Sequence, residues 1–242
     1  MNKEQNMGKK YPKSVPELTE EQKIIKDQWM IQWHEILPNK YTIIEKFNHV
    51  GGFQNKDIPV ECRTLEVGAG LGAHIAFEKL THQDYYALEL RPDMAERLHR
   101  RFPLVKVIVG DIQKEIDLPK EYFDRIIAVH VLEHLPDLPA ALSQIKRLLK
   151  PNGFCEFVIP CEGGLMYSLA RMISAKRIFE RTYKMSYDWC IQSEHVNNCV
   201  EIIEELENAG FCITWRRYFP FLIPWYFCNL ALGIRAETFK LI

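Results

Sequence analysis

The stretch of sequence that decides the fold is TLEVGAGLG, residues 64–72. Its first residues, 64–67, are the end of a predicted strand, and glycines stand at positions 68, 70 and 72. Glycine adopts backbone angles that other residues avoid, and it lets a ligand press against main-chain N–H groups. The pattern therefore predicts a tight turn from a strand into a helix, with a ligand bound at the turn.

Two classes of ligand use such a loop. Dinucleotides use G-x-G-x-x-G/A, which Gly68, Gly70 and Ala73 satisfy. S-adenosylmethionine uses a loop with glycine at the fifth position, here Gly72, and an acidic residue before it, here Glu66. A pyrophosphate favours a helix N-terminus without a carboxylate nearby, whereas the sulfonium and ammonium groups of S-adenosylmethionine are cationic. Glu66 thus favours the methyl donor, and a nicotinamide-dependent oxidoreductase is the alternative.

Apolar runs and helical patterns alternate around this loop. Strands are predicted at 62–67, 85–90, 105–109, 125–131 and 154–159, with helices between them at 73–80, 93–102 and 138–149. A helix at 199–208 and strands at 211–219 and 227–235 follow. Strands that alternate with helices of about ten residues indicate β-α-β units. The predicted fold class is α/β, with a doubly wound, mostly parallel sheet.

Three of the predicted strands end in residues suited to successive parts of the methyl donor: its ribose, its adenine and its methyl group. Glu89 ends the second strand, where a carboxylate can accept both ribose hydroxyls. Asp111 and Ile112 follow the third strand, where they can meet the adenine amino group and ring. The fourth strand leads into VLEHL, residues 131–135, where the methyl group of the donor is expected.

These signatures, in this order, resemble those of class I S-adenosylmethionine-dependent methyltransferases of the small-molecule group. The resemblance covers residues 60–160 strongly and 195–237 weakly. It implies a seven-stranded sheet whose last strand is antiparallel, S-adenosylmethionine as cofactor, and a small-molecule acceptor methylated on oxygen or nitrogen by in-line displacement. By position it implies a set of donor-binding residues: Glu66, Gly68, Ala69, Gly70, Gly72, Glu89, Leu90, Asp111, Ile112 and His130. A non-catalytic S-adenosylmethionine-binding protein is a further alternative.

Histidines near the fourth strand are candidates for catalysis. A hydroxyl acceptor must lose its proton, and His195 is the first candidate for general base, with His134 and Tyr187 as alternatives. His130, Glu133 and His134 also form H-x-x-E-H. Certain methyltransferases of ubiquinone and small-RNA pathways bind magnesium or manganese through E-x-x-E-H, but this chain has His130 in place of the first acid. No metal is therefore expected.

Two segments lie outside the resemblance. Residues 1–55 are predicted to form a tail and a helical cap before a methyltransferase domain at 56–242; a capping box starts a helix at Thr19, and Pro38 ends it. The stripe on that helix comprises Ile25, Trp29, Trp33 and Leu37, expected mainly to pack. Residues 161–194 are rich in aromatics and methionine and follow the fifth strand, where ligands enter such sheets, so they are predicted to form a lid.

Composition and charge indicate which kinds of partner the protein is expected to bind. The 242 residues carry 31 Lys and Arg against 32 Asp and Glu, so the net charge of −1 gives nucleic acid no basic surface. Seven cysteines without a C-x-x-C pair indicate reduced core residues in a cytoplasmic protein. No transmembrane segment is expected, but the apolar run at 219–227 fits either a buried strand or a surface for peripheral membrane contact or for a glycan- or lipid-linked acceptor. The oligomeric state stays open.

Overall fold

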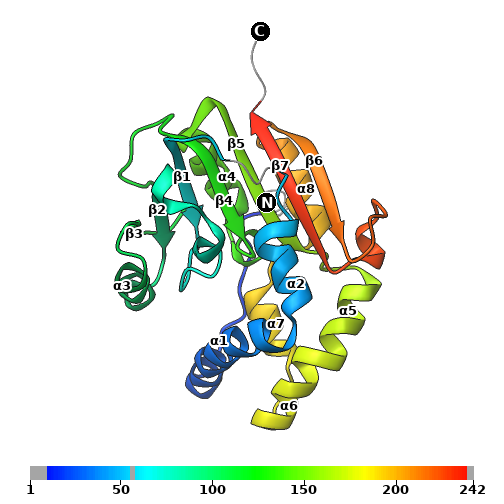
Figure 1. The fold of residues 1–242 in the computed structure, drawn as a ribbon. Coiled ribbons are helices and arrows are strands. Elements are labelled where there is room, and N and C mark those ends of the chain that lie inside the picture. Colours follow the sequence, from blue (N-terminus) through cyan, green and yellow to red (C-terminus); the bar gives the residue numbers. More distant parts are fainter. Residues whose placement is uncertain (1–9, 55–57, 239–242) are drawn as a thin grey trace, which may run out of the picture.

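The computed structural model describes residues 10–54 and 58–238, apart from the side chains at 34, 35 and 37–39. A seven-stranded sheet in the order β3-β2-β1-β4-β5-β7-β6 forms its centre (Figure 1). The strands are β1 (Cys62–Val67), β2 (Gln83–Glu89), β3 (Lys106–Val109), β4 (Phe123–Val129), β5 (Leu149–Pro160), β6 (Phe211–Phe219) and β7 (Ala231–Thr238). β1 pairs in parallel with β2 and β4, while β7 is antiparallel to both β5 and β6. The predicted fold is confirmed.

Helices cover both faces of the sheet. On one face, α4 (Leu138–Leu148) and α8 (Cys199–Asn208) bury their apolar stripes against the central strands. On the other face lie α3 (Pro92–Arg101) and the segment around Phe47 and Phe53. The parallel strands end at the same edge of the sheet, so the loops that follow them converge there.

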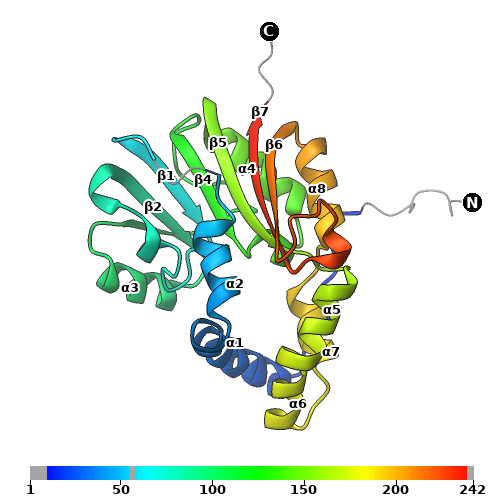
Figure 2. The same cartoon turned by 45° about the vertical axis from the view of Figure 1, so that its right-hand side comes forward.

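Two helical segments extend from this edge (Figures 1 and 2). The first contains α1 (Glu20–Lys40), α2 (Thr42–Lys46) and a π-turn, Phe47–Gly51. The second follows β5 and contains α5 (Leu165–Arg171), a π-turn (Met172–Lys176), α6 (Arg177–Tyr183) and α7 (Asp188–Glu194). The two segments pack on each other, because Trp29 of α1 lies 5.3 Å from Phe179 and 6.0 Å from Tyr187, ring centre to ring centre.

The predicted start of α1 is confirmed, and its predicted end is wrong. The Thr19 hydroxyl accepts the N–H of Gln22, and the Gln22 side chain accepts the N–H of Thr19, which is the expected capping box. The helix continues past Pro38 to Lys40, because a proline near a helix end removes only one N–H from the last turns. Trp29 is buried, as expected for a packing residue, and the side chain of Leu37 lies outside the described part of the chain.

The predicted helix at 73–80 is also wrong. Only 3₁₀ turns form there, Ile75–Phe77 and Leu80–His82, and Glu78 between them is extended. The reason is a buried ion pair: the Glu78 carboxylate lies 2.8 Å from the Arg125 guanidinium of β4.

The start of the last strand also differs from the prediction. The Asn229 side chain donates to the carbonyls of Ile223 and Trp225 and so shapes the loop before the strand. As a result, β7 begins at residue 231 instead of 227.

Part of the expected N-terminal tail is docked. The Lys13 N–H donates to the Pro136 carbonyl at 2.8 Å, and its ammonium lies 2.8 Å from the Glu201 carboxylate of α8. Lys10 pairs with Glu205 at 2.9 Å. Lys10 and Lys13, in the described part of the predicted tail, are thus counter-ions for acidic residues of α8.

The structure also shows the state of the cysteines and the character of the helices. All seven cysteines are free thiols, and five of them are buried. Over residues 10–54 and 58–238, no helix is both long enough and apolar enough to span a bilayer.

Replacement of Trp29 tests the contact between the two helical segments. Trp29→Ala should lower the free energy of unfolding by about 3–5 kcal/mol, because it leaves a cavity against Phe179 and Tyr187. Ile31→Ala, at an exposed position of the same helix, should change it by less than about 0.5 kcal/mol. Urea unfolding measures both, and equal effects would contradict the packing.

Candidate active site

In the glycine loop after β1, the middle glycine has free space where a side chain would stand, and the glycines on either side of it do not. Gly68 and Gly72 have φ of +66° and +78°, and a Cβ built on them would come within 2.6 Å of Val131 and 2.4 Å of Phe102. A Cβ on Gly70 would meet no atom of the described residues within 4 Å. The loop backbone is therefore pressed against the protein at both ends and exposes main chain at Gly70, where a ligand can approach.

Glu89 lies directly beside this open position. Its carboxylate is buried and accepts the N–H of Gly70 at 2.9 Å and the N–H of Arg91 at 2.9 Å, one on each oxygen. A carboxylate oxygen has a second acceptor site, so hydroxyl groups of a ligand can still be bound. The structure thus brings together the loop and the predicted ribose acceptor.

The other predicted donor-binding residues differ in their exposure. Asp111 follows β3, is half-buried and accepts two hydrogen bonds from Gln113, at 3.0 and 3.1 Å. Ile112 and Ala69 are buried, while Leu90 is 61% exposed. Leu90 is thus free to cover a ligand, whereas Ile112 forms part of the core that backs it.

Glu66, near the end of β1, is buried against Tyr85. It is 3% exposed, and the Tyr85 hydroxyl donates to its carboxylate at 2.8 Å. Burial raises the pKa of Glu66 to about 8, despite the hydrogen bond from Tyr85 that lowers it. Glu66 is thus mostly uncharged at neutral pH, which removes the direct charge attraction on which its predicted role depends.

β4 ends in a turn of unusual backbone shape. His130 has φ of +52°, which ends the strand at Val129 and not at 131 as expected. Its imidazole Nδ1 lies 3.0 Å from the Glu133 carboxylate. Burial tends to raise the pKa of Glu133, but the hydrogen bond with His130 and the nearby His134 and His195 lower it to about 2. Glu133 is a buried anion surrounded by three imidazoles.

His134 and His195 lie together at this turn. Their rings are 4.8 Å apart, centre to centre, and nearly perpendicular. His134 Nδ1 lies 2.8 Å from the Glu194 carbonyl and 3.3 Å from its carboxylate. Burial lowers the pKa of His134, but Glu194 and Glu133 outweigh it and raise the pKa to about 8. His134 is therefore mostly protonated at neutral pH and is a poor general base.

His195 is held by a carboxylate of the insertion. Its Nδ1 is hydrogen-bonded to Glu162, which also pairs with Arg171 of α5. Burial tends to raise the pKa of Glu162, but the bonds with His195 and Arg171 lower it. An ionised carboxylate on Nδ1 leaves Nε2 to accept a proton, which is the arrangement of a histidine base.

The loop that contains His195 is hydrogen-bonded to the turn after β4, residues 130–135, which we call the strand-four turn. The N–H groups of Val196 and Asn197 donate to the Glu133 carbonyl at 2.8 and 3.0 Å. The Asn197 amide donates to the carbonyls of Leu132 and Leu135 at 2.9 and 2.7 Å. Both catalytic candidates, His134 and His195, thus occupy one rigid unit. Tyr187, the third candidate, is buried against Trp29 instead.

Glu133, His134 and His195 also form a candidate metal group. One ligand atom from each lies within 4.8 Å of the others, and one Glu133 oxygen is buried without a hydrogen-bond partner. Glu194 and Glu162 bind Nδ1 of the two histidines, which leaves Nε2 of each ring for a metal, but a bound metal would have to displace the proton that His134 carries at neutral pH. The absence of a metal stays a prediction.

Sequence reasoning missed Glu162, Glu194 and Asn197 as parts of this site. Each acts through a partner far away in the chain: Glu162 on His195, Glu194 on His134, and Asn197 on Leu132 and Leu135. The sequence could have indicated Glu194, because it stands directly before the candidate His195. Nothing near Glu162 in the sequence marks it as part of the site.

Comparison with known proteins agrees with this geometry. A family model described as a methyltransferase domain matches residues 65–157. A ubiquinone biosynthesis O-methyltransferase of Rhodopseudomonas palustris (strain TIE-1) is 23% identical over 159 residues, or 62% of each chain. A probable phthiotriol/phenolphthiotriol dimycocerosates methyltransferase of Mycobacterium ulcerans is 33% identical over 107 residues, covering 41% of this chain and 40% of that one. The chain spans less than two thirds of these relatives.

Solved structures share the fold. A protein from Pyrococcus horikoshii superposes with a TM-score of 0.63 and 12% identity, over 86% of this chain and 99% of that one. A Thermotoga maritima S-adenosylmethionine-dependent methyltransferase gives 0.61 and 18%, over 89% and 99%. These structures show that the chain has the fold found in S-adenosylmethionine-dependent methyltransferases. Residues 65–157 of this chain match a methyltransferase domain, which supports the resemblance that the sequence predicted.

The pKa of Glu66 predicts a pH-dependent stability. The folded-state pKa, about 8, is above the ordinary value of 4.5, so the unfolded chain loses the proton first as pH rises. Wild-type stability should therefore fall between pH about 5 and 8, relative to Glu66→Gln, which keeps an acceptor for Tyr85. Urea unfolding of both proteins across that range measures the difference. A difference that does not change with pH would show that Glu66 is ionised in the fold.

Proposed function

We propose that the protein transfers the methyl group of S-adenosylmethionine to an oxygen of a small-molecule acceptor. The observation that supports this proposal most is that three features lie at the carboxyl ends of the parallel strands. They are the open backbone at Gly70, the Glu89 carboxylate, and the neighbouring rings of His134 and His195. Transfer to nitrogen was equally open from the sequence. The Glu162–His195 pair favours oxygen, because a hydroxyl must be deprotonated during transfer and a neutral amine need not be.

The residues fit the donor. Gly70 offers main chain without a side chain in the way, and Glu89 has free acceptor sites for ribose hydroxyls. Asp111 and the exposed Leu90 would hold the adenine side, and His130, one third exposed, would border the methyl group. When bound, S-adenosylmethionine supplies a carbon already activated by a positive sulfur. The protein has to align the acceptor and take its proton.

His195 would take that proton. Glu162 accepts from Nδ1, which leaves Nε2 as the base, and the bonds from the Asn197 loop hold the ring at the end of β4. The neighbouring His134 is cationic and would favour an anionic acceptor oxygen by charge. The two predicted catalytic residues thus receive different roles.

The helical segments at 20–51 and 161–194 would enclose the acceptor. Their mutual packing, and the origin of the second segment at the end of β5, support this proposal. We keep the division into a cap at 1–55, a domain at 56–242 and a lid at 161–194 as part of this proposal. The names of the relatives include a quinone-pathway and a mycocerosate enzyme. Those names and the exposed apolar residues near 221–227 support an acceptor linked to a lipid, over a glycan.

Replacement of Glu89 tests the donor site. Glu89→Ala should weaken binding of S-adenosylhomocysteine by about 2 kcal/mol or more, because two hydroxyls lose a charged acceptor. Asp93→Ala, a nearby exposed carboxylate on α3, should leave the affinity unchanged. Calorimetric titration measures both. Unchanged affinity in a folded Glu89→Ala protein would remove Glu89 from the site.

Replacement of His195 tests the base. His195→Ala should lower kcat by about 10²–10⁴-fold with little change in the affinity for S-adenosylmethionine. Glu162→Gln should lower kcat by a smaller factor, and His99→Ala on α3 should have no effect. Chelation with EDTA should leave the rate unchanged. Loss of activity with EDTA and its return with magnesium or manganese would instead assign Glu133, His134 and His195 to a metal.

A further inference from the structure

The loop between β6 and β7 presents apolar side chains to solvent. Phe221, Leu222, Ile223, Trp225 and Phe227 are between 37% and 76% exposed, and the Trp225 and Phe227 rings stack at 5.2 Å. Scattered apolar residues are normal on a surface, but five in seven consecutive positions are not. The sequence left open whether this run is buried, and the structure exposes it.

The loop is held in this conformation from inside. Asn229 is fully buried and donates to the carbonyls of Ile223 and Trp225, at 3.1 and 2.9 Å, while its oxygen accepts the N–H of Phe221 at 2.9 Å. An internal amide with three bonds to the loop backbone fixes its shape. The apolar side chains therefore form a preformed surface and not a frayed segment.

The continuous helix 165–183 extends this surface. Its start adjoins the loop, since a Cβ on Gly164 would lie 2.7 Å from the Tyr226 carbonyl (Figures 1 and 2). Its inner side packs Ala175 and Phe179 against α1 and α7. Four apolar residues in its first half are 44–69% exposed: Leu165, Leu169, Met172 and Ile173.

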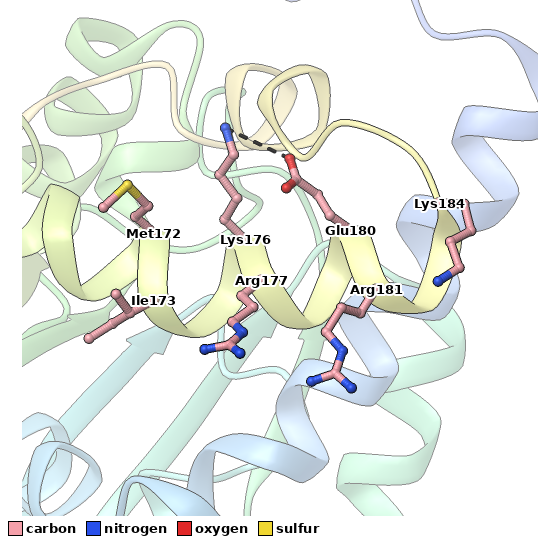
Figure 3. A pocket seen from close by; sticks show the side chains of 7 residues that line it. All are labelled: Met172, Ile173, Lys176, Arg177, Glu180, Arg181 and Lys184. Atoms are coloured by element: carbon pink, nitrogen blue, oxygen red, sulfur yellow. Dashed lines mark ion pairs between the residues drawn. The ribbon is translucent and has the colours of Figure 1, made fainter.

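The second half of the same helix is cationic. Figure 3 shows the side chains of Ile173, Arg177 and Arg181 pointing to one side of the helix, around a pocket that Lys184 also lines. Arg177, Arg181 and Lys184 are exposed, and none of them forms an ion pair with any described residue. The single acid of the pocket, Glu180, lies 3.7 Å from Lys176 and is partly neutralised by it. This pocket lies on the helix and not at the glycine loop.

We propose that loop 221–227 and the exposed face of helix 165–183 dock the protein on an anionic lipid bilayer. Aromatic and aliphatic side chains enter the interfacial region of a bilayer, and lysine and arginine beside them bind anionic headgroups. The two signals together give stable peripheral binding where either alone is weak. A second copy of the chain would cover the apolar part equally well, but its net charge of only −1 attracts the three free cations less than an anionic bilayer does.

The docking surface also has a place in the proposed chemistry. Loop 221–227 follows β6 and helix 165–183 follows β5, so both stand at the sheet edge that carries Gly70 and His195. An acceptor in the bilayer would lie beside the site. The docking itself does not rest on methyl transfer, because it uses none of the donor or histidine residues.

Flotation with vesicles tests the docking. The full chain, without S-adenosylmethionine, should float with phosphatidylcholine vesicles that contain phosphatidylglycerol and should not float with phosphatidylcholine alone. Arg177→Glu with Arg181→Glu should weaken binding at least about tenfold, and added salt should weaken the wild type. Leu222→Ala with Trp225→Ala should weaken binding severalfold at any salt concentration. Circular dichroism checks that each variant is folded.

Matched controls and contrary results complete the experiment. Arg97→Glu with Leu104→Ala changes an exposed cation and an exposed apolar residue near β3, the outer strand on the other side of the sheet from β6. This variant should bind as the wild type does. Failure of the wild type to float with anionic vesicles, or an equal loss in the control, overturns the proposal. A wild-type dimer that becomes monomeric in Leu222→Ala with Trp225→Ala, measured by light scattering, assigns the surface to a second copy and overturns it too. Neither result bears on methyl transfer.

Discussion

The close contact of the glycine loop with its surroundings is the constraint on which the site depends. Val131 fills the space beside Gly68, and Phe102 and Leu98 fill the space beside Gly72. No side chain fits at either position, so the loop lies flat against the end of the sheet. The remaining free position, Gly70, then faces outward and donates its N–H to Glu89. The ribose acceptor and the exposed backbone are thus set by one packing arrangement.

The strand-four turn connects this donor side to the histidines. Val131 packs against Gly68 of the glycine loop. Two residues later, Glu133 contacts all parts of the histidine side of the site. Its carbonyl accepts two N–H groups from the His195 loop, and its carboxylate lies 3.0 Å from His130 and 3.8 Å from His134. A burial this complete is tolerated because imidazoles on three sides stabilise the charge. Donor loop and candidate base are therefore parts of one rigid unit.

Local patterns predicted those parts of the chain whose partners are near in sequence. Strands 62–67 and 211–219 and helix 199–208 have the predicted bounds, because alternation, capping and a terminal Ala-Gly specify them locally. The expected helix at 73–80 fails because Glu78 pairs with Arg125, a residue 47 positions away. The predicted role of Glu66 changes for a similar reason, since Tyr85 of the neighbouring strand covers it. Glu162 was not found because nothing near it in the chain marks its contact with His195.

The most direct test of the account is calorimetric titration of the wild-type protein with S-adenosylhomocysteine and, separately, with NADH. The methyltransferase domain matched at residues 65–157, together with the open backbone at Gly70 and the carboxylate beside it, predicts one site for S-adenosylhomocysteine and no heat of binding for NADH. Glu66 no longer decides between these ligands, because it is buried and mostly uncharged. Binding of NADH with no binding of S-adenosylhomocysteine would contradict the assignment of the glycine loop to the methyl donor.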